Sequence, residues 1–323
     1  MTARENQIAL LRQAKDLLAE KRLAEARATL DQLKSGLTEN ATEWLGPLTI
    51  LGLPRKLHSA YLKLAKAEDD TLARIGLQYN LVPSPERIMQ HLHIDDATRQ
   101  QMAACNARPV PRVIHQIWIG GKPVPPTVEA WQRHAVATGF QHRLWREDDI
   151  RAIGLFDNPV FRAFLEAGDY PGAVDVARYL ILAVEGGIYL DCDWYPARME
   201  TGLDTFLPLV GLTALAEQTP RNLGADSLLL TNSLIASPPQ HPLFSRLVDA
   251  LPAVMAELPG APAWWITGPV IFTLLARMTA VTIPDTGFVA ANLPVNAPMD
   301  DVLAAVRKAE TGASGFLIAW KCW

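Results

Sequence analysis

One segment, residues 174–196, constrains the fold of this chain more than any other. Its sequence is VDVARYLILAVEGGIYLDCDWYP. The first half has the apolar character of a short helix, two glycines interrupt that helix, and residues 187–191 form an apolar run typical of a buried strand. A helix that leads directly into a buried strand is typical of an α/β domain with a mostly parallel sheet.

Two aspartates, Asp191 and Asp193, follow this strand. Because side chains alternate along a strand, we expect both carboxylates to face one side and Cys192 the other. Carboxylates that point the same way repel each other and are costly to desolvate. A bound Mn²⁺ or Mg²⁺ ion removes both penalties, since hard oxygen ligands suit these metals. Such ions also bind phosphate oxygens, so a phosphate ester is the expected ligand.

The composition sets wide bounds on size and partners. The chain has 323 residues, of which 49% are hydrophobic and 20% are charged. These values fit one large domain or two smaller ones with a sizeable core, and they exclude wholesale disorder. A net charge of −4 gives no electrostatic reason to expect nucleic acid as a partner. The three cysteines are widely spaced and match no metal-binding pattern, so we expect free thiols in a reducing compartment.

The sequence also indicates where the protein resides. Its first residues are charged and helical in pattern, and they lack the apolar core of a signal peptide. No run of about 18 apolar residues occurs, so no membrane-spanning helix is expected. We therefore expect a soluble cytoplasmic protein, either free or peripheral at the inner membrane.

Two regions of different character are predicted. Residues 1–105 are helical in pattern: residues 5–34 resemble one helical hairpin of tetratricopeptide type, and a second helical region covers 53–103. We expect this extension to serve in packing or in docking of another protein, with a recognition arm as the alternative. Residues 106–323 alternate between strand and helix patterns and are expected to form the α/β domain. Its predicted strands are 113–119, 139–148 and 187–191, and its first predicted helices are 149–153, 158–167 and 174–184.

Four segments of the second region carry recognisable motifs. They are VPRVIHQIWIG at 110–120, Asp175-x-x-Arg178 with EGGIYLDCD at 185–193, Asn232-x3-Ala236-x4-His241-Pro242, and Thr267-Gly268-Pro269. Together they resemble the DXD-type glycosyltransferases (glycosyltransferase family 32), a family related to glucosylating bacterial toxins and fungal α-mannosyltransferases. Their order and spacing follow the family from about residue 108 onward.

The resemblance implies a GT-A fold, an α/β domain that holds a nucleotide-sugar at the carboxyl edge of its strands. It also implies a retaining, metal-dependent transfer of a hexose to a hydroxyl acceptor. The first expectation for the donor is a UDP-sugar, and the second is GDP-mannose. The acceptor would be a saccharide, a lipid-linked group or a protein, and cell-surface polysaccharide synthesis is the expected setting.

By the same resemblance, four residues would be catalytic. Asp191 and Asp193 would hold Mn²⁺ or Mg²⁺, and the alternative is a solvated turn at the end of the strand. Asp175 and Arg178 would bind the hydroxyls of the donor sugar and its phosphate. These two residues are three apart and share a helix face, so an ordinary ion pair within the helix is the alternative. Arginine suits phosphate because its planar donors match the phosphate oxygens.

Four further residues would bind the donor. Trp118 would stack on the nucleobase or belong to the core, and Tyr189 would either fill the core or place its hydroxyl near the donor. Asn232 would bind the sugar or acceptor, with a loop cap as the alternative. Trp320 aligns with an aromatic residue that closes over the diphosphate in relatives, and Lys321 is an alternative source of positive charge there.

Other side chains have simpler expectations. We expect His115 to be a hydrogen-bonded core histidine. Candidate acceptor-side aromatic residues, which would look the same if they belonged to the core, are Trp194, Tyr195, Trp264 and Trp265.

Two other functions are open. A phosphatase of the haloacid-dehalogenase type also has a strand that ends in Asp-x-Asp, but Tyr195 stands where that chemistry needs Thr or Val. A later Gly-Asp-x3-Asp motif is also missing from the sequence. The other alternative is a non-catalytic nucleotide-sugar-binding or scaffold protein, which catalytic turnover would distinguish from an enzyme.

Overall fold

The computed structural model describes residues 2–217, 229–285, 287–312 and 315–323. It divides into two compact units. One contains the residues up to His93 together with Ala250–Leu274, and the other is built from Ile94–Ala216, Leu230–Asp249 and the residues from Leu275 onward. None of the helices within these described ranges combines the length and the apolar character that crossing a bilayer requires.

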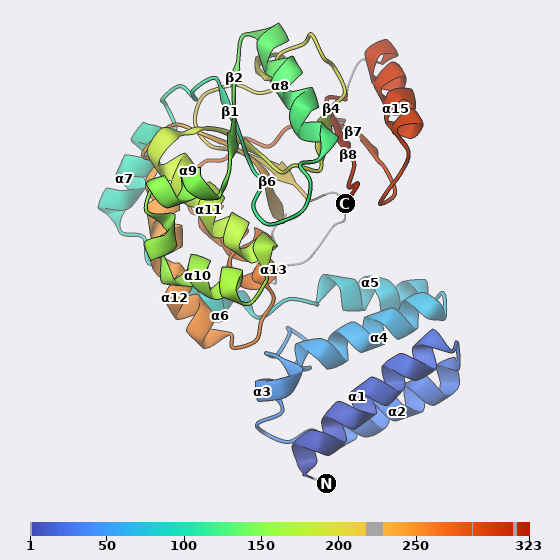
Figure 1. The fold of residues 1–323 in the computed structure, drawn as a ribbon. Helices are drawn as coiled ribbons and strands as arrows, with labels where there is room; N and C mark the ends of the chain where they lie inside the picture. The colour runs from blue at the N-terminus through green and yellow to red at the C-terminus, as the bar shows by residue number, and fades with distance from the viewer. Residues whose placement is uncertain (1, 218–228, 286, 313–314) are drawn as a thin grey trace. The chain divides into compact units, whose positions relative to one another are not determined.

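The first unit begins with a hairpin of two helices, α1 (Ala3–Ala19) and α2 (Leu23–Ser35) (Figure 1). A capping box starts α1: the Thr2 hydroxyl accepts the Glu5 N–H at 3.2 Å, and the Glu5 carboxylate accepts the Thr2 N–H at 2.8 Å. Apolar residues at helical spacing are buried between the helices, and they include Ala14, Leu17, Ala26, Leu30 and Leu33.

The rest of this unit is also helical. It contains α3 (Thr42–Leu45), α4 (Arg55–Ala67), α5 (Thr71–Tyr79), α6 (Pro85–Met89) and α13 (Ala263–Ile266). Every named element between residues 2 and 105 is a helix, as the sequence pattern predicts. The division between the units falls after His93, whereas the sequence places the end of the helical extension at residue 105.

The second unit is built on a five-stranded sheet with the strand order β2-β1-β3-β6-β5. The strands are β1 (Val113–Ile117), β2 (Gln141–Trp145), β3 (Gly187–Leu190), β5 (Thr213–Ala216) and β6 (Leu230–Ser237). β1 pairs in parallel with β2 and β3, while β6 pairs antiparallel with both β3 and β5. All strands except β6 therefore run in the same direction, which confirms the predicted α/β domain with a mostly parallel sheet.

Helices connect these strands and follow them. They are α7 (Asp96–Cys105), α8 (Pro126–Thr138), α9 (Glu147–Ala152), α10 (Pro159–Glu166), α11 (Tyr170–Glu185) and α15 (Met299–Thr311), with 3-10 turns η1 (Leu155–Asp157) and η2 (Leu203–Thr205). The residues of α12 (Pro242–Glu257) and α14 (Pro269–Ala276) are divided between the two units, at Ala250 and after Leu274. A second sheet has the order β4 (Trp194–Pro196), β8 (Leu317–Ala319) and β7 (Val289–Asn292). Its β4–β8 pairing brings the segment after residue 315 beside the chain that follows the two aspartates.

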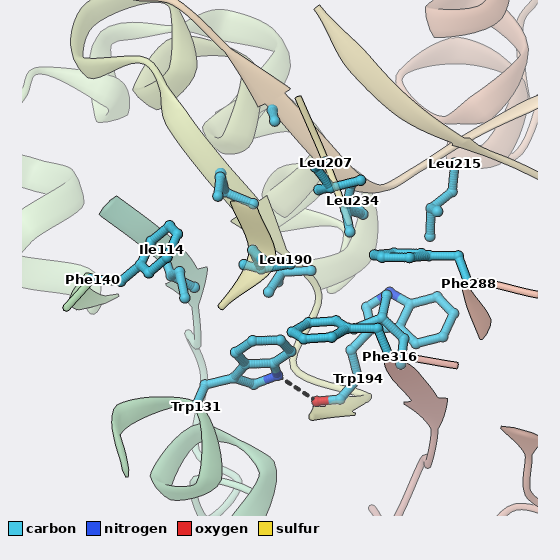
Figure 2. Close-up of a cluster of buried hydrophobic side chains, with 14 of the residues drawn as sticks. Ile114, Trp131, Phe140, Leu190, Trp194, Leu207, Leu215, Leu234, Phe288 and Phe316 are labelled. Carbon is cyan, nitrogen blue, oxygen red and sulfur yellow. Dashed lines mark hydrogen bonds between the residues drawn. The ribbon is translucent and has the colours of Figure 1, made fainter. Parts of the chain in front are cut away.

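A buried cluster lies between the main sheet, α8 and the small sheet (Figure 2). Its largest members are aromatic: the rings of Phe288 and Phe316 stack at 5.7 Å, and the Trp131 indole N–H donates to the Trp194 carbonyl at 2.9 Å. Because Trp194 opens β4, this hydrogen bond ties α8 to the strand that follows the aspartates. The core therefore fixes one end of the turn that carries Asp193.

The structure corrects one prediction about this turn. β3 ends at Leu190, so Asp191 and Asp193 do not alternate along a strand as expected. The last ladder bond runs from the Asp191 N–H to the Ser233 carbonyl at 2.8 Å, and the Trp194 N–H then bonds the Asp191 carbonyl at 3.3 Å. The reason is that β4 pairs in a different sheet from β3, so the chain must turn between them.

Other predicted boundaries differ by a few residues. The first strand ends at residue 117 and the second spans 141–145, because Glu147 already begins α9. The helix predicted at 174–184 begins earlier, at Tyr170, where the Asp169 carboxylate accepts the Gly172 N–H at 3.1 Å as an N-cap.

Candidate active site

The junction between α11 and β3 requires the glycine pair seen in the sequence. Gly187 has a φ of +94°, and a Cβ atom there would lie 2.8 Å from both His115 Nε2 and the Val113 carbonyl oxygen. A residue with a side chain would therefore be strained and would also clash. This tight junction fixes the end of α11 against the start of β3, and these two elements carry the charged residues of the site.

His115 packs at this junction and is fully buried. Its Nε2 lies 3.0 Å from the Gly186 carbonyl, and its Nδ1 accepts the Trp145 indole N–H at 3.1 Å. Burial lowers the pKa of His115 to about 4, which keeps the ring neutral. The prediction of a hydrogen-bonded core histidine is confirmed.

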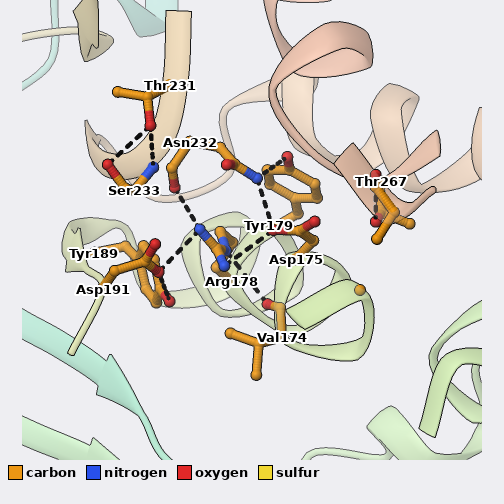
Figure 3. Close-up of polar contacts among 12 residues, drawn as sticks. Val174, Asp175, Arg178, Tyr179, Tyr189, Asp191, Thr231, Asn232, Ser233 and Thr267 are labelled. Carbon is orange, nitrogen blue, oxygen red and sulfur yellow. Dashed lines mark hydrogen bonds and ion pairs between the residues drawn. The ribbon is translucent and has the colours of Figure 1, made fainter. Parts of the chain in front are cut away.

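Arg178 is the centre of a buried polar network (Figure 3). Its side chain is 4% exposed, and its guanidinium lies 3.0 Å from Asp175 Oδ1 and 3.1 Å from Asp191 Oδ1. It also donates to the Asn232 carbonyl at 2.6 Å, and its charge lies 4.4 Å from the centre of the Tyr189 ring. The pair with Asp175 predicted on one helix face is present, and Arg178 links that face to the end of β3.

Two further side chains hold this network in place. Asn232 lies in β6, is 5% exposed, and donates from Nδ2 to Asp175 Oδ1 at 2.8 Å and to the Tyr179 hydroxyl at 2.9 Å. The Tyr189 hydroxyl donates to Asp191 Oδ1 at 2.6 Å. Tyr189 is thus both a core aromatic residue and a direct partner of Asp191. Asn232 is neither in a loop nor a cap, because its amide bonds the side chains of α11.

The charged groups of the network and their burial shift the pKa values of Arg178 and Tyr189. Burial by itself would lower the pKa of Arg178, but Asp191, Tyr189 and Asp175 together raise it above its usual value. Arg178 therefore stays charged and holds both carboxylates. Burial also raises the pKa of Tyr189, so its hydroxyl keeps the proton that it donates to Asp191.

The surroundings of Asp193 disfavour its charged form. Burial raises its pKa to about 6, and the neighbouring charge of Asp191 adds to this effect, while Lys321 and Arg178 oppose it. Both Tyr189 and Arg178 contact the same oxygen of Asp191, Oδ1, which leaves Oδ2 as the oxygen available to a cation. The turn thus presents two half-buried carboxylates with too little positive charge between them.

This donor set fits a hard divalent cation. Such an ion would remove the repulsion between the two aspartates, and their oxygens are the ligand type that Mg²⁺ and Mn²⁺ prefer. Within the described part of the chain, no group of three or more His, Cys, Asp or Glu side chains forms a complete metal site. Water or ligand oxygens would therefore have to complete the coordination of an ion held by Asp191 and Asp193.

A cavity of about 460 Å³ lies beside the turn. Among its lining residues are the predicted site residues Trp118, Arg178, Tyr189, Asp191 and Asp193. Val174, one turn before Arg178 on α11, also lines it, so the cavity extends along α11 from the two aspartates. Its walls combine aromatic and apolar surface with a few charged groups, as small-molecule sites do.

Of the predicted aromatic residues, Trp118 lines the cavity and Trp320 does not. Trp118 is 8% exposed, its indole N–H donates to the Lys122 carbonyl at 3.0 Å, and its ring meets that of Trp323 edge-on at 5.0 Å. Trp320 is not among the described residues that line the cavity; its indole N–H bonds the Ala297 carbonyl at 2.9 Å in a neighbouring buried cluster. Its backbone N–H nevertheless bonds the Asp193 carbonyl at 2.7 Å.

Sequence reasoning missed several lining residues. Tyr170 starts α11 and packs so close to Gly120 that a Cβ there would lie 3.0 Å from its ring. Lys122 and Trp323 also line the cavity. The sequence shows that Tyr170 precedes the predicted helix that ends at the glycine pair. Only the folded structure shows that this residue lies at the cavity beside the ends of the strands.

The candidate acceptor-side aromatic residues are mostly core residues. Trp194 and Tyr195 are buried in β4, and Trp265 is buried within the first unit. Trp264, in the first unit as well, is half-buried.

Part of this site is similar to a described protein family. Residues 133–205 match the family described as "Glycosyltransferase sugar-binding region containing DXD motif". The match includes α11, β3 and the turn, and therefore Asp175, Arg178, Asp191 and Asp193. Residues 133–205 are therefore similar to a DXD-type glycosyltransferase region. In the structure this range contains β2, β3 and β4 as well as the Asp-x-Asp turn.

Three proteins that are similar to this chain are named as glycosyltransferases. The chain is 34% identical over 145 residues to "Uncharacterized glycosyltransferase L373" of Acanthamoeba polyphaga mimivirus, which covers 43% of this chain and 54% of that protein. It is 25% identical over 191 residues to "Inositol phosphoceramide mannosyltransferase 3" of Schizosaccharomyces pombe, covering 57% and 49%, and 27% identical over 169 residues to mannosyltransferase 1 of that name, covering 50% and 48%. The chain thus spans about half the length of these relatives.

A solved structure, "PaToxG Glycosyltransferase", aligns with 60% of this chain and 78% of its own chain. The TM-score of this alignment is 0.43 and the sequence identity is 16%.

Proposed function

We propose that the chain is a metal-dependent glycosyltransferase that moves a hexose from a nucleotide-sugar to a hydroxyl acceptor, with retention of configuration. The observation that carries this proposal is the Asp-x-Asp turn at the cavity, tied through Arg178 to Asp175 within the matched family region. The donor we favour is a UDP-sugar. GDP-mannose is second, and the names of the two yeast relatives support mannose as a candidate sugar.

Asp191 and Asp193 would hold a Mn²⁺ or Mg²⁺ ion between their carboxylates. Bound there, the ion would supply positive charge to the donor diphosphate. The chain prepares this site in advance, because Arg178 and Tyr189 fix Asp191 Oδ1 at 3.1 and 2.6 Å and prevent that carboxylate from rotating. Preorganised charges of this kind cost little reorganisation when the reaction occurs.

Asp175 and Arg178 would set the position of the donor sugar. Both are almost fully buried: Arg178 lines the cavity, Asp175 lies 3.0 Å from its guanidinium, and Asn232 restrains Asp175 from β6. A sugar bound against them would be oriented by fixed donors and acceptors rather than by mobile surface groups. In the transfer, the acceptor oxygen forms a bond to the anomeric carbon, the bond to the diphosphate breaks, and the departing diphosphate takes the acceptor proton.

The acceptor would be a saccharide, a lipid-linked group or a protein hydroxyl, and cell-surface polysaccharide synthesis is the setting we favour. The helices before residue 105 would serve in protein docking.

The test is release of UDP or GDP from a panel of nucleotide-sugars in the presence of Mn²⁺ and without acceptor. Wild type is compared with Asp193→Asn and with Asp148→Asn, which changes an exposed aspartate on α9. We expect slow release from one donor by wild type and the control, and at least about a hundredfold less from Asp193→Asn. Equal release by all three proteins, or none from any donor, would contradict the proposal.

A further inference from the structure

A second cavity lies next to the one beside the aspartate turn. Its volume is about 310 Å³, and the two cavities have three lining residues in common: Ile119, Gly120 and Tyr170. The remaining residues that line the second cavity belong to α9, η1 and α10, and they are Glu147, Ile150, Arg151, Phe156, Phe161 and Leu165. The two cavities therefore meet where Tyr170 approaches the segment that follows β1.

Tyr170 packs on this segment at a position that has no side chain. Gly120 has a φ of +95°, and a Cβ atom there would lie 3.0 Å from the Tyr170 ring, so the ring lies against the backbone. That backbone is held by hydrogen bonds, because the Gly120 N–H donates to Glu147 Oε1 at 2.6 Å. The Trp118 N–H likewise donates to the Trp145 carbonyl at 3.0 Å. The Tyr170 ring and Gly120 thus form a partition between the cavities, and its backbone half is fixed.

The side-chain half of this partition can be changed without loss of the helix that carries it. Tyr170 is 43% exposed and occupies the first position of α11. The helix is capped by Asp169, whose carboxylate accepts the Gly172 N–H at 3.1 Å, and the Tyr170 ring takes no part in this cap. Removal of the ring should therefore join the two cavities and leave α11 in place.

The second cavity has walls that suit a flat ring. The rings of Phe156 and Phe161 lie 5.3 Å apart, and the Arg151 guanidinium lies 4.2 Å from the centre of the Phe156 ring. Aromatic surface supports stacking of a nucleobase, and carboxylate and guanidinium groups such as those of Glu147 and Arg151 form hydrogen bonds to base edges. The second cavity is therefore space that a wide base could use, and the partition separates it from the cavity at the turn.

We propose that Tyr170 determines which base the donor carries. With its ring on Gly120, the cavity at the turn accepts the single ring of uracil and excludes the two fused rings of guanine. This inference rests on the proposed function, in which the donor nucleotide occupies that cavity with its base near Trp118. A purine needs the space of the Tyr170 ring and of the cavity behind it, whereas a pyrimidine fits in front of the partition. A steric wall discriminates because the wrong ligand must displace the ring or remain partly unbound.

The experiment measures the dissociation constants of UDP and GDP by calorimetry in the presence of Mn²⁺. Wild type is compared with Tyr170→Ala, which removes the ring, and with Tyr170→Phe, which keeps it. The control is Tyr79→Ala, which removes a half-buried ring from the end of α5 in the other unit. Tm values show whether each variant is folded, and Tyr170→Leu replaces Tyr170→Ala if the alanine variant is not.

We expect wild type to bind UDP at least about 10-fold more tightly than GDP. Removal of the Tyr170 ring should lower this ratio by about 10-fold or more, because GDP binds more tightly, while Tyr170→Phe and Tyr79→Ala should keep the wild-type ratio. A preference of wild type for GDP, an unchanged ratio without the ring, or a fall caused only by weaker UDP binding would overturn this inference and leave the proposed function standing. If wild type binds neither nucleotide with Mn²⁺, both are overturned.

Discussion

Replacement of Arg178 by methionine is expected to destabilise the α/β unit by about 3–5 kcal/mol, the usual cost of removing one partner of a buried ion pair. The Arg178 side chain is 4% exposed and lies 3.0 Å from Asp175. In the variant, Asp175 would keep the hydrogen bond from Asn232 but lose its neighbouring positive charge at a site where it is 7% exposed. Methionine preserves the length and apolar contact of the arginine stem, so the lost charge dominates the effect.

The assay is urea unfolding at pH 7 without metal, with Arg133→Met as the control. Arg133 lies on α8, where its side chain is 62% exposed and 3.9 Å from Glu129, so a change of no more than about 0.5 kcal/mol is expected. The double variant Arg178→Met/Asp175→Asn removes both charges of this ion pair. Its free energy of unfolding should recover about half of what Arg178→Met alone loses. A loss below about 1 kcal/mol for Arg178→Met, or no recovery in the double variant, would refute this account of the network.

Three more predictions follow from particular residues. Asp193→Asn should stabilise the metal-free protein at pH 7 by roughly 1–3 kcal/mol, because the pKa of Asp193 is raised from 3.8 to about 6. A carboxyl group whose pKa is raised by folding binds its proton more tightly in the folded state. The free energy of unfolding of wild type should therefore fall as the pH rises from about 4 to 6, and that of the variant should not show this fall. Gly187→Ala should cost several kcal/mol or prevent folding, because its Cβ would clash at 2.8 Å, whereas Gly121→Ala meets open space and should be tolerated. Burial raises the pKa of both Cys192 and Cys322, but Cys192 is buried and Cys322 only half-buried, so iodoacetamide at pH 8 should label the native protein at Cys322 well before Cys192.

Each of these predictions has a measurable contrary outcome. Parallel pH profiles for wild type and Asp193→Asn would show that the raised pKa of Asp193 does not affect folding. Equal unfolding midpoints for the two glycine variants would contradict the close contact at Gly187. Rapid labelling of Cys192, mapped by mass spectrometry, would place its thiol in a more accessible environment than the structure does.

The sequence predicts the fold class because local patterns determine it. Apolar runs bounded by glycine and proline mark β1 and β3, and the length and character of the segment before Gly186 mark α11. The conformation of the Asp191–Asp193 turn could not be predicted in this way. It depends on the pairing of β4 with β8, more than 120 residues later in the chain, and period-two alternation describes a strand only while it remains in one sheet.

Among the site residues, too, local contacts could be predicted from the sequence and non-local contacts could not. The proximity of Asp175 and Arg178 follows from helical spacing and is present in the structure. The position of Asn232 beside them depends on β6 pairing with β3, a non-local contact that one sequence does not reveal. Likewise, the sequence shows that Trp320 is aromatic, but only the fold shows that its indole is buried away from the cavity and that Lys321 lines it.

A crystal structure with Mn²⁺ and UDP or GDP, with the metal located by its anomalous scattering, tests directly whether the Asp-x-Asp turn is the donor site. We expect one strong peak within bonding distance of carboxylate oxygens of Asp191 or Asp193, about 2–2.2 Å, with diphosphate oxygens on its other side. A peak elsewhere, or a bound nucleotide outside the cavity lined by Trp118, Arg178 and the aspartate turn, would contradict the assignment of this turn as the donor site.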